Sequence, residues 1–253
     1  MEDLTVFLRR MPKVELHVHL ESTMPGEMLA RFASRQGREL PRPAEQLYDC
    51  SAEDLSDFLS FLDRICSFVG TPEELTEAAE HAALAAGEEN ILYSELILNP
   101  THWPQFTAAE IIAAVTAGFD RAAERGGADC RFTLSLSRTQ TGTEAMALVG
   151  RLVREQVPLN ICLTSNLALL YRHPGEHPLR RLLDAGAAVT LSRDDPTFLG
   201  GLTLTEELRR AAEFAHMGRE ELIRCQEAAV DAAFCGPESK ERLRRALAEF
   251  RRS

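Results

Sequence analysis

The sequence of 253 residues contains no apolar run that approaches the length of a membrane-spanning helix. Its opening residues, MEDLTVFLRRMPK, carry acids near the front and lack the central apolar stretch of a secretory signal. We therefore expect a chain that resides in the cytoplasm and has no membrane partner. With 45% apolar and 26% charged residues, the chain can bury a hydrophobic core.

The chain also lacks the Cys-x-x-Cys spacing that marks many metal and redox sites. Scattered cysteines are most often reduced thiols buried in a core. The sequence therefore predicts no disulfide framework. The cysteines are Cys50, Cys66, Cys130, Cys162, Cys225 and Cys235.

Basic residues are fewer than acidic residues in this sequence. Lysine and arginine together number 28 against 39 aspartates and glutamates, which leaves a net charge of −11. Almost all of the basic residues are arginines, and they are spread through the expected helices. An acidic chain without a basic cluster is repelled by phosphate backbones, so nucleic acid is not an expected partner.

No internal repeat, low-complexity tract or long linker divides the sequence, so we expect one domain over residues 1–253. β-prone runs alternate with helical patterns, which is typical of a parallel α/β sheet. Thr71-Pro72-Glu73-Glu74 and Thr107-Ala108-Ala109-Glu110 have the form of capping boxes and mark two helix starts. The expected strands are residues 14–20, 91–98, 131–137, 158–163 and 187–192, and the expected helices are residues 24–36, 54–69, 72–87, 107–125 and 141–155.

Two histidines stand near the end of the first expected strand, in the run VELHVHLE. Residues two apart on a strand project from the same face, so His17 and His19 point the same way. Neighbouring imidazoles can both bind one divalent cation such as zinc, iron or nickel. The alternative is a pair of ordinary strand histidines, one of them hydrogen-bonded within the core.

A second short β-prone run, residues 187–192, leads into Arg193-Asp194-Asp195-Pro196. A strand that ends in two carboxylates brings acidic groups to one edge of a sheet. The same residues also suit a capped turn that leads into a helix, and this interpretation needs no functional site.

In this order the two motifs resemble those of the adenosine deaminase family of metal-dependent amidohydrolases. The resemblance extends over most of the chain, through MPKVELHVHLES, NILYSELILNP, VPLNICLTSN and EHPLRRLLDAGAAVTLSRDDP. It implies a TIM barrel, in which eight parallel strands close into a ring surrounded by helices. Five expected strands are too few for such a ring. We therefore predict an incomplete barrel with the strand order 158–163, 187–192, 14–20, 91–98, 131–137.

The resemblance also implies roles for individual residues. His17 and His19 match the first two zinc ligands of the family, and Asp194 matches the carboxylate ligand that takes part in catalysis. Asp195 matches the partner of a purine ring nitrogen. Glu21 matches a substrate-contacting position, where several members that act on adenine or larger adenine derivatives carry Glu. By resemblance the chain is a zinc-dependent hydrolase that deaminates adenosine or a related adenine compound, at the C–N bond of a cyclic amidine.

Two motifs of the family are missing. The strand-end HAGE motif, which carries the third histidine ligand and the general acid, does not occur in the sequence. The HG motif, which carries a further catalytic histidine, is also absent. We expect the chain to be shortened near residues 138–157, with three barrel units missing. General acid–base assistance is commonly worth about 10²- to 10⁴-fold in rate, so an efficient deaminase is not expected.

Two other functions remain open. A non-catalytic descendant of the family would bind a purine or a metal ion, or would act as an oligomer. A different metal-dependent hydrolysis would need a ligand from a partner subunit. Turnover separates the catalytic functions from the non-catalytic one.

An open sheet would leave the strands at 131–137 and 158–163 with unpaired edges. It would also expose side chains that barrel closure buries, and the alternation of the strands points to Leu16, Val18 and Ile161. Exposed edges and apolar side chains favour association. We therefore expect a homo-oligomer or a marginally stable monomer, unless the helix at 141–155 covers the gap or the two edges pair directly.

Several polar residues follow the expected strands at the end where barrel sites form. Each is a candidate for lining the pocket, although turn capping is the simpler account of the two asparagines. These residues are Asn99, His102, Ser165 and Asn166.

Overall fold

A computed structural model of the chain describes residues 3–49, 55–134, 158–171 and 173–252. All of its strand pairs are parallel, as predicted for an α/β fold. The helix expected at residues 141–155 and the last part of the strand expected at 131–137 lie outside the described residues. The strands are β1 (Lys13–His19), β2 (Ile91–Leu98), β3 (Asp129–Leu134), β4 (Leu159–Ile161) and β5 (Val189–Leu191).

The strands form two sheets. One has the order β1-β2-β3, and the other contains β4 and β5. The two sheets meet where the chain has left β5, through an isolated parallel bridge between Val18 and Asp194. The predicted strand order is therefore right, and the barrel is incomplete. Residues 187–192 lie beside β1 as predicted, but β5 ends at Leu191 and the bridge to β1 is made by a residue beyond its end.

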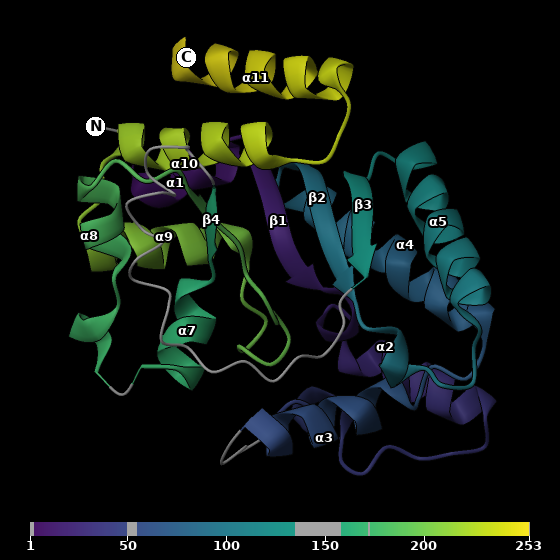
Figure 1. The fold of residues 1–253 in the computed structure, drawn as a ribbon. Helices are drawn as coiled ribbons and strands as arrows, with labels where there is room; N and C mark the ends of the chain where they lie inside the picture. Colours follow the sequence, from purple (N-terminus) through teal and green to yellow (C-terminus); the bar gives the residue numbers. More distant parts are fainter. Residues whose placement is uncertain (1–2, 50–54, 135–157, 172, 253) are drawn as a thin grey trace.

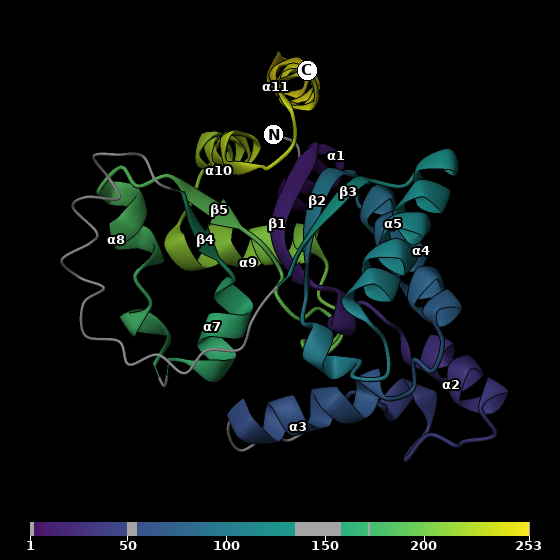
Figure 2. The same ribbon diagram turned by 45° about the vertical axis from the view of Figure 1, so that its right-hand side comes forward.

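The helices surround these sheets on several sides. The carboxyl ends of the strands point toward α2 and α3, while α10 and α11 lie at the opposite end of the molecule (Figure 1, Figure 2). Helices α4 and α5 pack side by side against the three-stranded sheet. The described helices are α1 (Leu4–Arg10), α2 (Gly26–Arg35), α3 (Leu55–Cys66), α4 (Pro72–Glu88), α5 (Ala108–Glu124), α7 (Leu163–Leu169), α8 (Leu179–Asp184), α9 (Leu204–Ala215), α10 (Arg219–Ala232) and α11 (Pro237–Arg252).

The two capping sequences begin helices as predicted, with one difference. Thr107 and Glu110 form a reciprocal capping box at the start of α5. At the start of α4 the Thr71 hydroxyl accepts from the Glu74 N–H at 3.2 Å. The Glu74 carboxylate, however, accepts from the Gly70 N–H at 2.8 Å. The expected box at Thr71 is only half formed, because Glu74 caps the preceding loop instead.

The side chains expected to be exposed by an open barrel are mostly covered. Val18 and Ile161 are 1% and 7% exposed and belong to the main hydrophobic core, so this expectation is wrong for both. A register shift between Glu15 and Val18 interrupts the alternation of β1, and Val18 then pairs with Leu96 of the same core. Leu16 is half-buried. Within the described residues β3 and β4 each lack a strand partner on one side. Association of copies through these edges stays a prediction.

The remaining expectations concern thiols and charge. The five cysteines in the described residues are all free and buried, as expected, and Cys50 lies outside them.

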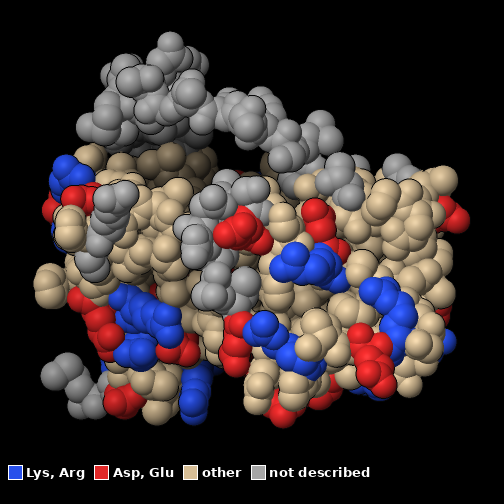
Figure 3. All heavy atoms as spheres, turned by 90° about the horizontal axis from the view of Figure 1, so that it is seen from below, with Lys and Arg blue, Asp and Glu red and all other residues tan. Residues whose placement is uncertain are grey.

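Acidic and basic side chains are interspersed on the described part of the face seen in Figure 3, toward which the strands point. No helix in the described ranges combines the length and the apolar character needed to cross a bilayer.

Helices α4 and α5 approach each other closely at Gly118. A Cβ atom placed there would lie 2.5 Å from the carbonyl oxygen of Thr76 and 2.7 Å from the Cβ of Ala79. Replacing Gly118 by alanine gains helix propensity of about 1 kcal/mol. Forcing two packed helices apart typically costs about 1–3 kcal/mol. We therefore expect Gly118→Ala to lower the free energy of unfolding, as measured by urea denaturation.

The matched control is Gly175→Ala, because a Cβ at Gly175 meets nothing within 4 Å. We expect its urea midpoint to be unchanged. A Gly118→Ala variant as stable as this control would contradict the close approach of the two helices.

Candidate metal centre

β1 ends with two histidines whose rings lie together. The ring centroids of His17 and His19 are 5.4 Å apart, and the ring planes are inclined at 66°. The side chains are 35% and 25% exposed, so a ligand can reach both. The register shift between Glu15 and Val18 falls at His17. The two rings nevertheless reach the same acidic group.

Asp194 meets these rings from the segment that follows β5. Its φ of 66° is left-handed, a conformation that costs a residue with a side chain roughly 1–2 kcal/mol. Two hydrogen bonds hold this backbone against β1. The His19 N–H donates to the Asp194 carbonyl at 2.8 Å, and the Asp194 N–H donates to the His17 carbonyl at 3.1 Å. Attachment to β1 therefore offsets the strain at Asp194.

The carboxylate of Asp194 is divided between two sets of partners. Its Oδ2 accepts a hydrogen bond from the Ser165 hydroxyl at 2.6 Å. Its Oδ1 lies 3.2 Å from Nε2 of His17 and 3.4 Å from Nε2 of His19. In a tetrahedral zinc site, zinc–nitrogen and zinc–oxygen distances of about 2.0–2.2 Å put neighbouring donor atoms roughly 3.3 Å apart. Oδ1 therefore has the spacing from both imidazoles that donors around one cation have.

Two more carboxylates are buried beside this group. Glu21 is fully buried and Asp195 is 7% exposed. Oε1 of Glu21 accepts from the Asn99 N–H at 2.7 Å, whereas Oε2 lies 3.8 Å from Nδ1 of His19. Among the described residues, neither Oε2 of Glu21 nor Oδ1 of Asp195 has a hydrogen-bond partner. Because unpaired buried carboxylate oxygens are costly, the site favours a cation or a ligand that donates hydrogen bonds.

These neighbours also set the charges in the site. Burial opposes a charged His19, but the carboxylates of Glu21, Asp195 and Asp194 outweigh it and raise the pKa of His19 to about 9. Burial raises the pKa of Asp195 to about 6. Burial also opposes charge on Asp194, yet its hydrogen bond with His17 helps to lower the pKa of this carboxyl. A metal ion that binds His19 would therefore displace a proton from it.

The donors in this cluster fit a divalent metal ion. Within the described residues, ligand atoms of His19, Asp194 and Asp195 lie within 4.8 Å of one another, and so do those of His17, Cys162 and Asp194. Imidazole and carboxylate are ordinary zinc ligands. The unpaired carboxylate oxygens supply negative charge for a dication to balance. The structure thus brings His17 and His19 each to Asp194, and it places the two histidines in different donor groups that share this carboxylate.

Cys162 is a member of this cluster that the sequence reasoning missed. It follows β4, occupies the N-cap position of α7 and is 6% exposed. Burial raises the pKa of its thiol well above the usual value, so the thiol is neutral when no cation is bound. Its place near the end of the expected strand at 158–163 could have identified Cys162 from the sequence, because the two histidines stand at the same kind of position.

The polar residues that follow the strands divide into two groups. The hydroxyl of Ser165 contacts the metal cluster directly. Nδ1 of His102 lies 2.6 Å from Oδ1 of Asp63 on α3, and Oδ1 of Asn166 lies 3.2 Å from Nε2 of His177. His102 and Asn166 therefore bind neighbouring segments together, whereas Ser165 orients a candidate ligand.

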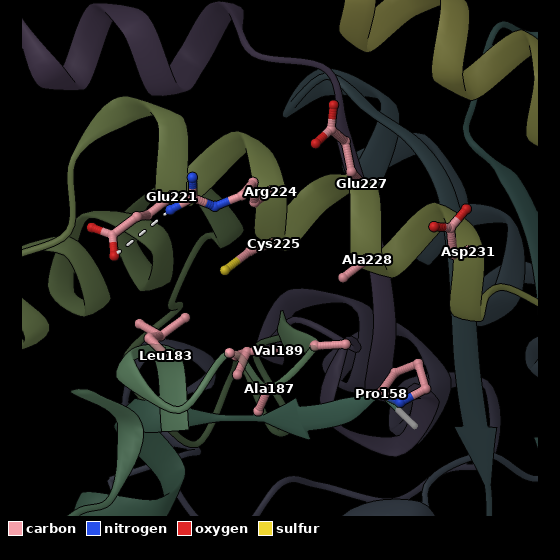
Figure 4. Close-up of a pocket in the computed structure, with 12 residues that line it drawn as sticks. Pro158, Leu183, Ala187, Val189, Glu221, Arg224, Cys225, Glu227, Ala228 and Asp231 are labelled. Atoms are coloured by element: carbon pink, nitrogen blue, oxygen red, sulfur yellow. Dashed lines mark ion pairs between the residues drawn. The ribbon is translucent and has the colours of Figure 1, made fainter. Parts of the chain in front are cut away.

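A cavity of about 360 Å³ lies elsewhere, between α10 and the segment that enters β5 (Figure 4). Acidic residues at its wall already have partners, since Glu221 pairs with Arg180 and Asp231 with Arg244. It lies at the amino-terminal ends of β4 and β5, whereas barrel sites form at the carboxyl ends of strands. We therefore place the candidate site at the histidine pair.

Comparison with known sequences points to one family. The family model described as adenosine deaminase matches residues 12–147 and 133–250. An adenine deaminase from Vibrio parahaemolyticus is 22% identical over 331 aligned positions, which cover 98% of this chain and 98% of that protein. Those 331 positions exceed the 253 residues of the chain by 78. At least that many positions of the relative therefore have no counterpart here.

Solved structures share the fold. An adenine deaminase from Arthrobacter aurescens superposes with a TM-score of 0.85 at 18% identity, covering 96% of this chain and 100% of that one. An amidohydrolase from Burkholderia ambifaria with bound zinc also gives a TM-score of 0.85, at 17% identity, covering 100% of this chain and 94% of that one. At these identities the likeness establishes the fold alone.

Proposed function

This chain belongs to the adenosine deaminase family, and we propose that its site is built for zinc-dependent hydrolytic deamination of an adenine compound. The observation that carries the proposal is the position of Asp194 Oδ1, within 3.4 Å of an Nε2 atom on both His17 and His19. The matched family model and the adenine deaminase from Vibrio parahaemolyticus support the substrate class. The glutamate at position 21 suits adenine or a larger adenine derivative, by the resemblance given above.

His17, His19 and Asp194 would hold one zinc ion. A zinc ion held there would supply a water molecule of lowered pKa, the nucleophile that hydrolysis at the amino-bearing ring carbon needs. Ser165 occupies Oδ2 of Asp194, which leaves Oδ1 for the metal. Glu21 faces Nδ1 of His19 and favours the ring orientation that turns Nε2 toward the site.

Asp195 is proposed to bind a ring nitrogen of the purine. Its Oδ1 is buried without a hydrogen-bond partner in the described part of the chain. Because burial raises its pKa to about 6, this carboxyl carries a proton in a minor share of molecules at neutral pH. It can therefore accept a hydrogen bond from a ring nitrogen or donate one to it. Oε2 of Glu21 is proposed as a second substrate contact.

We propose that turnover is slow, because the sequence lacks the motif that carries the general acid of the family. The gap of at least 78 positions in the alignment supports an internal shortening. The two family matches overlap at residues 133–147, a range that shares residues 138–147 with the expected shortening at 138–157. The absence of the general-acid motif also favours the second candidate function, a non-catalytic descendant that binds a purine or a metal ion.

We further propose a single domain over residues 1–253 that resides in the cytoplasm. The buried free thiols of the described residues support this location, because a reducing compartment keeps cysteines in that state. A purine-containing small molecule is the proposed partner.

Ammonia release tests the proposed function. Metal-loaded protein of verified length is incubated with adenine, adenosine and larger adenine nucleosides. We expect slow release from one of them, and we expect Asp194→Ala to abolish it. Purine binding without any ammonia release would instead select the non-catalytic descendant.

Metal content tests the ligand assignment separately. We expect one weakly bound zinc ion per chain, and clearly less zinc after dialysis in His17→Ala, because a catalytic zinc site commonly has three protein ligands and this variant keeps two. His81→Ala is the matched control, since His81 lies on α4 and outside the metal cluster. Equal zinc content in the parent chain and His17→Ala would contradict the assignment.

A further inference from the structure

The thiol of Cys162 lies beside the proposed metal ligands. Its Sγ, a ring nitrogen of His17 and a carboxylate oxygen of Asp194 all lie within 4.8 Å of one another. Cys162 precedes the first turn of α7, and Ser165 in that turn holds the carboxylate of Asp194. The start of α7 therefore contacts the metal cluster through two side chains.

A fourth donor is what this site lacks. Zinc is almost always four-coordinate in structural sites, and three protein ligands leave one position for water or another group. Thiolate is a preferred zinc ligand, with a zinc–sulfur distance of about 2.3 Å that puts sulfur roughly 3.5 Å from the other donor atoms. The donor atoms of Cys162, His17 and Asp194, which already lie within 4.8 Å of one another, need a movement of about 1 Å to reach that arrangement. His19 joins them through the same Asp194 carboxylate, whose Oδ1 is 3.4 Å from its Nε2.

A second observation points to a cation at the same place. Oδ1 of Asp195 and Oε2 of Glu21 are buried carboxylate oxygens without hydrogen-bond partners among the described residues. Asp195 shares the cluster with His19 and Asp194. The negative charge of these groups is a separate reason to place a dication here, and it does not depend on the thiol.

We infer that Cys162 is a fourth protein ligand of the proposed metal ion, which makes the site Cys-His₂-Asp. The inference rests on the proposed function, because it uses the same ion and the ligands His17, His19 and Asp194. On binding, the S–H bond of Cys162 breaks, the sulfur electron pair binds the metal and the proton passes to solvent.

Four protein ligands would change what the metal does. A closed tetrahedral site is typical of structural zinc and leaves no position for water. The ion would join β1, the end of β4 and the segment after β5, where strand pairing between the two sheets is limited to an isolated bridge among the described residues. Binding of the metal would therefore stabilise the fold, and water activation would require Cys162 to dissociate.

Cobalt(II) substitution tests this inference without a turnover assay. A thiolate bound to cobalt gives a sulfur-to-metal charge-transfer band in the near ultraviolet. We expect this band in the parent chain and its loss in Cys162→Ser. We also expect zinc affinity to fall at least about 10- to 100-fold in Cys162→Ser, the loss typical of removing even an outer-shell partner. Cys225→Ser is the matched control, because this thiol is 2% exposed but lies outside the cluster.

The outcomes separate the two proposals. A stoichiometric cobalt complex without the charge-transfer band would overturn the role of Cys162 and leave the centre of His17, His19 and Asp194 standing. Failure of the folded parent chain to bind cobalt or zinc would overturn that centre and the inference together. The spectrum of the parent chain decides between these results even if Cys162→Ser does not fold, which far-ultraviolet circular dichroism would reveal.

Discussion

Inserting the missing family segment between Gly150 and Arg151 is expected to raise the rate of ammonia release by at least about 10²- to 10⁴-fold. The segment would come from a complete relative and would carry the HAGE and HG motifs. By resemblance it supplies the general acid, the third histidine ligand and a further catalytic histidine. The stated factor is what proton transfer alone commonly contributes. The measurement is turnover of an adenine compound by the two metal-loaded chains.

Two controls separate catalysis from improved folding. The same insertion with alanine in place of the glutamate of HAGE should fold equally well and remain slow. The insertion combined with Asp194→Ala should also remain slow, because this variant lacks a ligand of the proposed metal centre. Robust activity in the uninserted chain, abolished by Asp194→Ala, would show that another residue already acts as the general acid.

Replacing Arg193 with methionine is expected to lower the free energy of unfolding by about 3–5 kcal/mol. The Arg193 guanidinium donates two hydrogen bonds to the Glu15 carboxylate. Its Nε lies 2.8 Å from Oε1 and its Nη2 lies 2.7 Å from Oε2. The Glu15 side chain is fully buried and that of Arg193 is 10% exposed. Removing the cation would leave the carboxylate buried without its partner, which is the costly way to break such a pair.

The position of this ion pair gives it a second consequence. Glu15 lies on β1, and Arg193 lies between the end of β5 and Asp194. The Arg193 N–H also donates to Glu15 at 3.1 Å, and its Nη1 lies 3.2 Å from Oε1 of Glu89 at the end of α4. The pair therefore fastens the segment that presents Asp194 to the strand that presents the histidines. We expect weaker zinc binding in any folded Arg193→Met protein.

Urea denaturation with two further variants checks the assignment. Arg193→Met combined with Glu15→Leu should recover most of the loss, because replacing both members of a buried pair by apolar groups is often near neutral. Arg121→Met should leave the free energy of unfolding almost unchanged, since its pair with Glu73 is exposed and screened by solvent. If Arg193→Met and Arg121→Met lowered the free energy of unfolding by equally small amounts, this result would contradict the role of Arg193 as the buried charge partner of Glu15.

Local sequence patterns by themselves determined where most elements lie. The expected strands at 14–20 and 91–98 agree with β1 and β2 to within one residue at each end. The cap at Thr107 begins a helix, and His17 and His19 both lie beside Asp194. Each of these features depends on residues a few positions apart, through side-chain alternation or a capping hydrogen bond. The strands expected at 158–163 and 187–192 are shorter, because β-prone residues continue beyond the last paired position.

The resemblance offered Asp194 as a partner of the histidines, but only the tertiary structure decided how it reaches them and which other groups join it. Asp194 reaches them through a left-handed backbone held by two hydrogen bonds to β1. Cys162 and Ser165 arrive from the start of α7, and no spacing in the sequence relates that turn to His17. Glu15 meets its partner 178 positions along the chain. Such contacts depend on how the two sheets come together, which is a property of the whole packed chain and has no local signature.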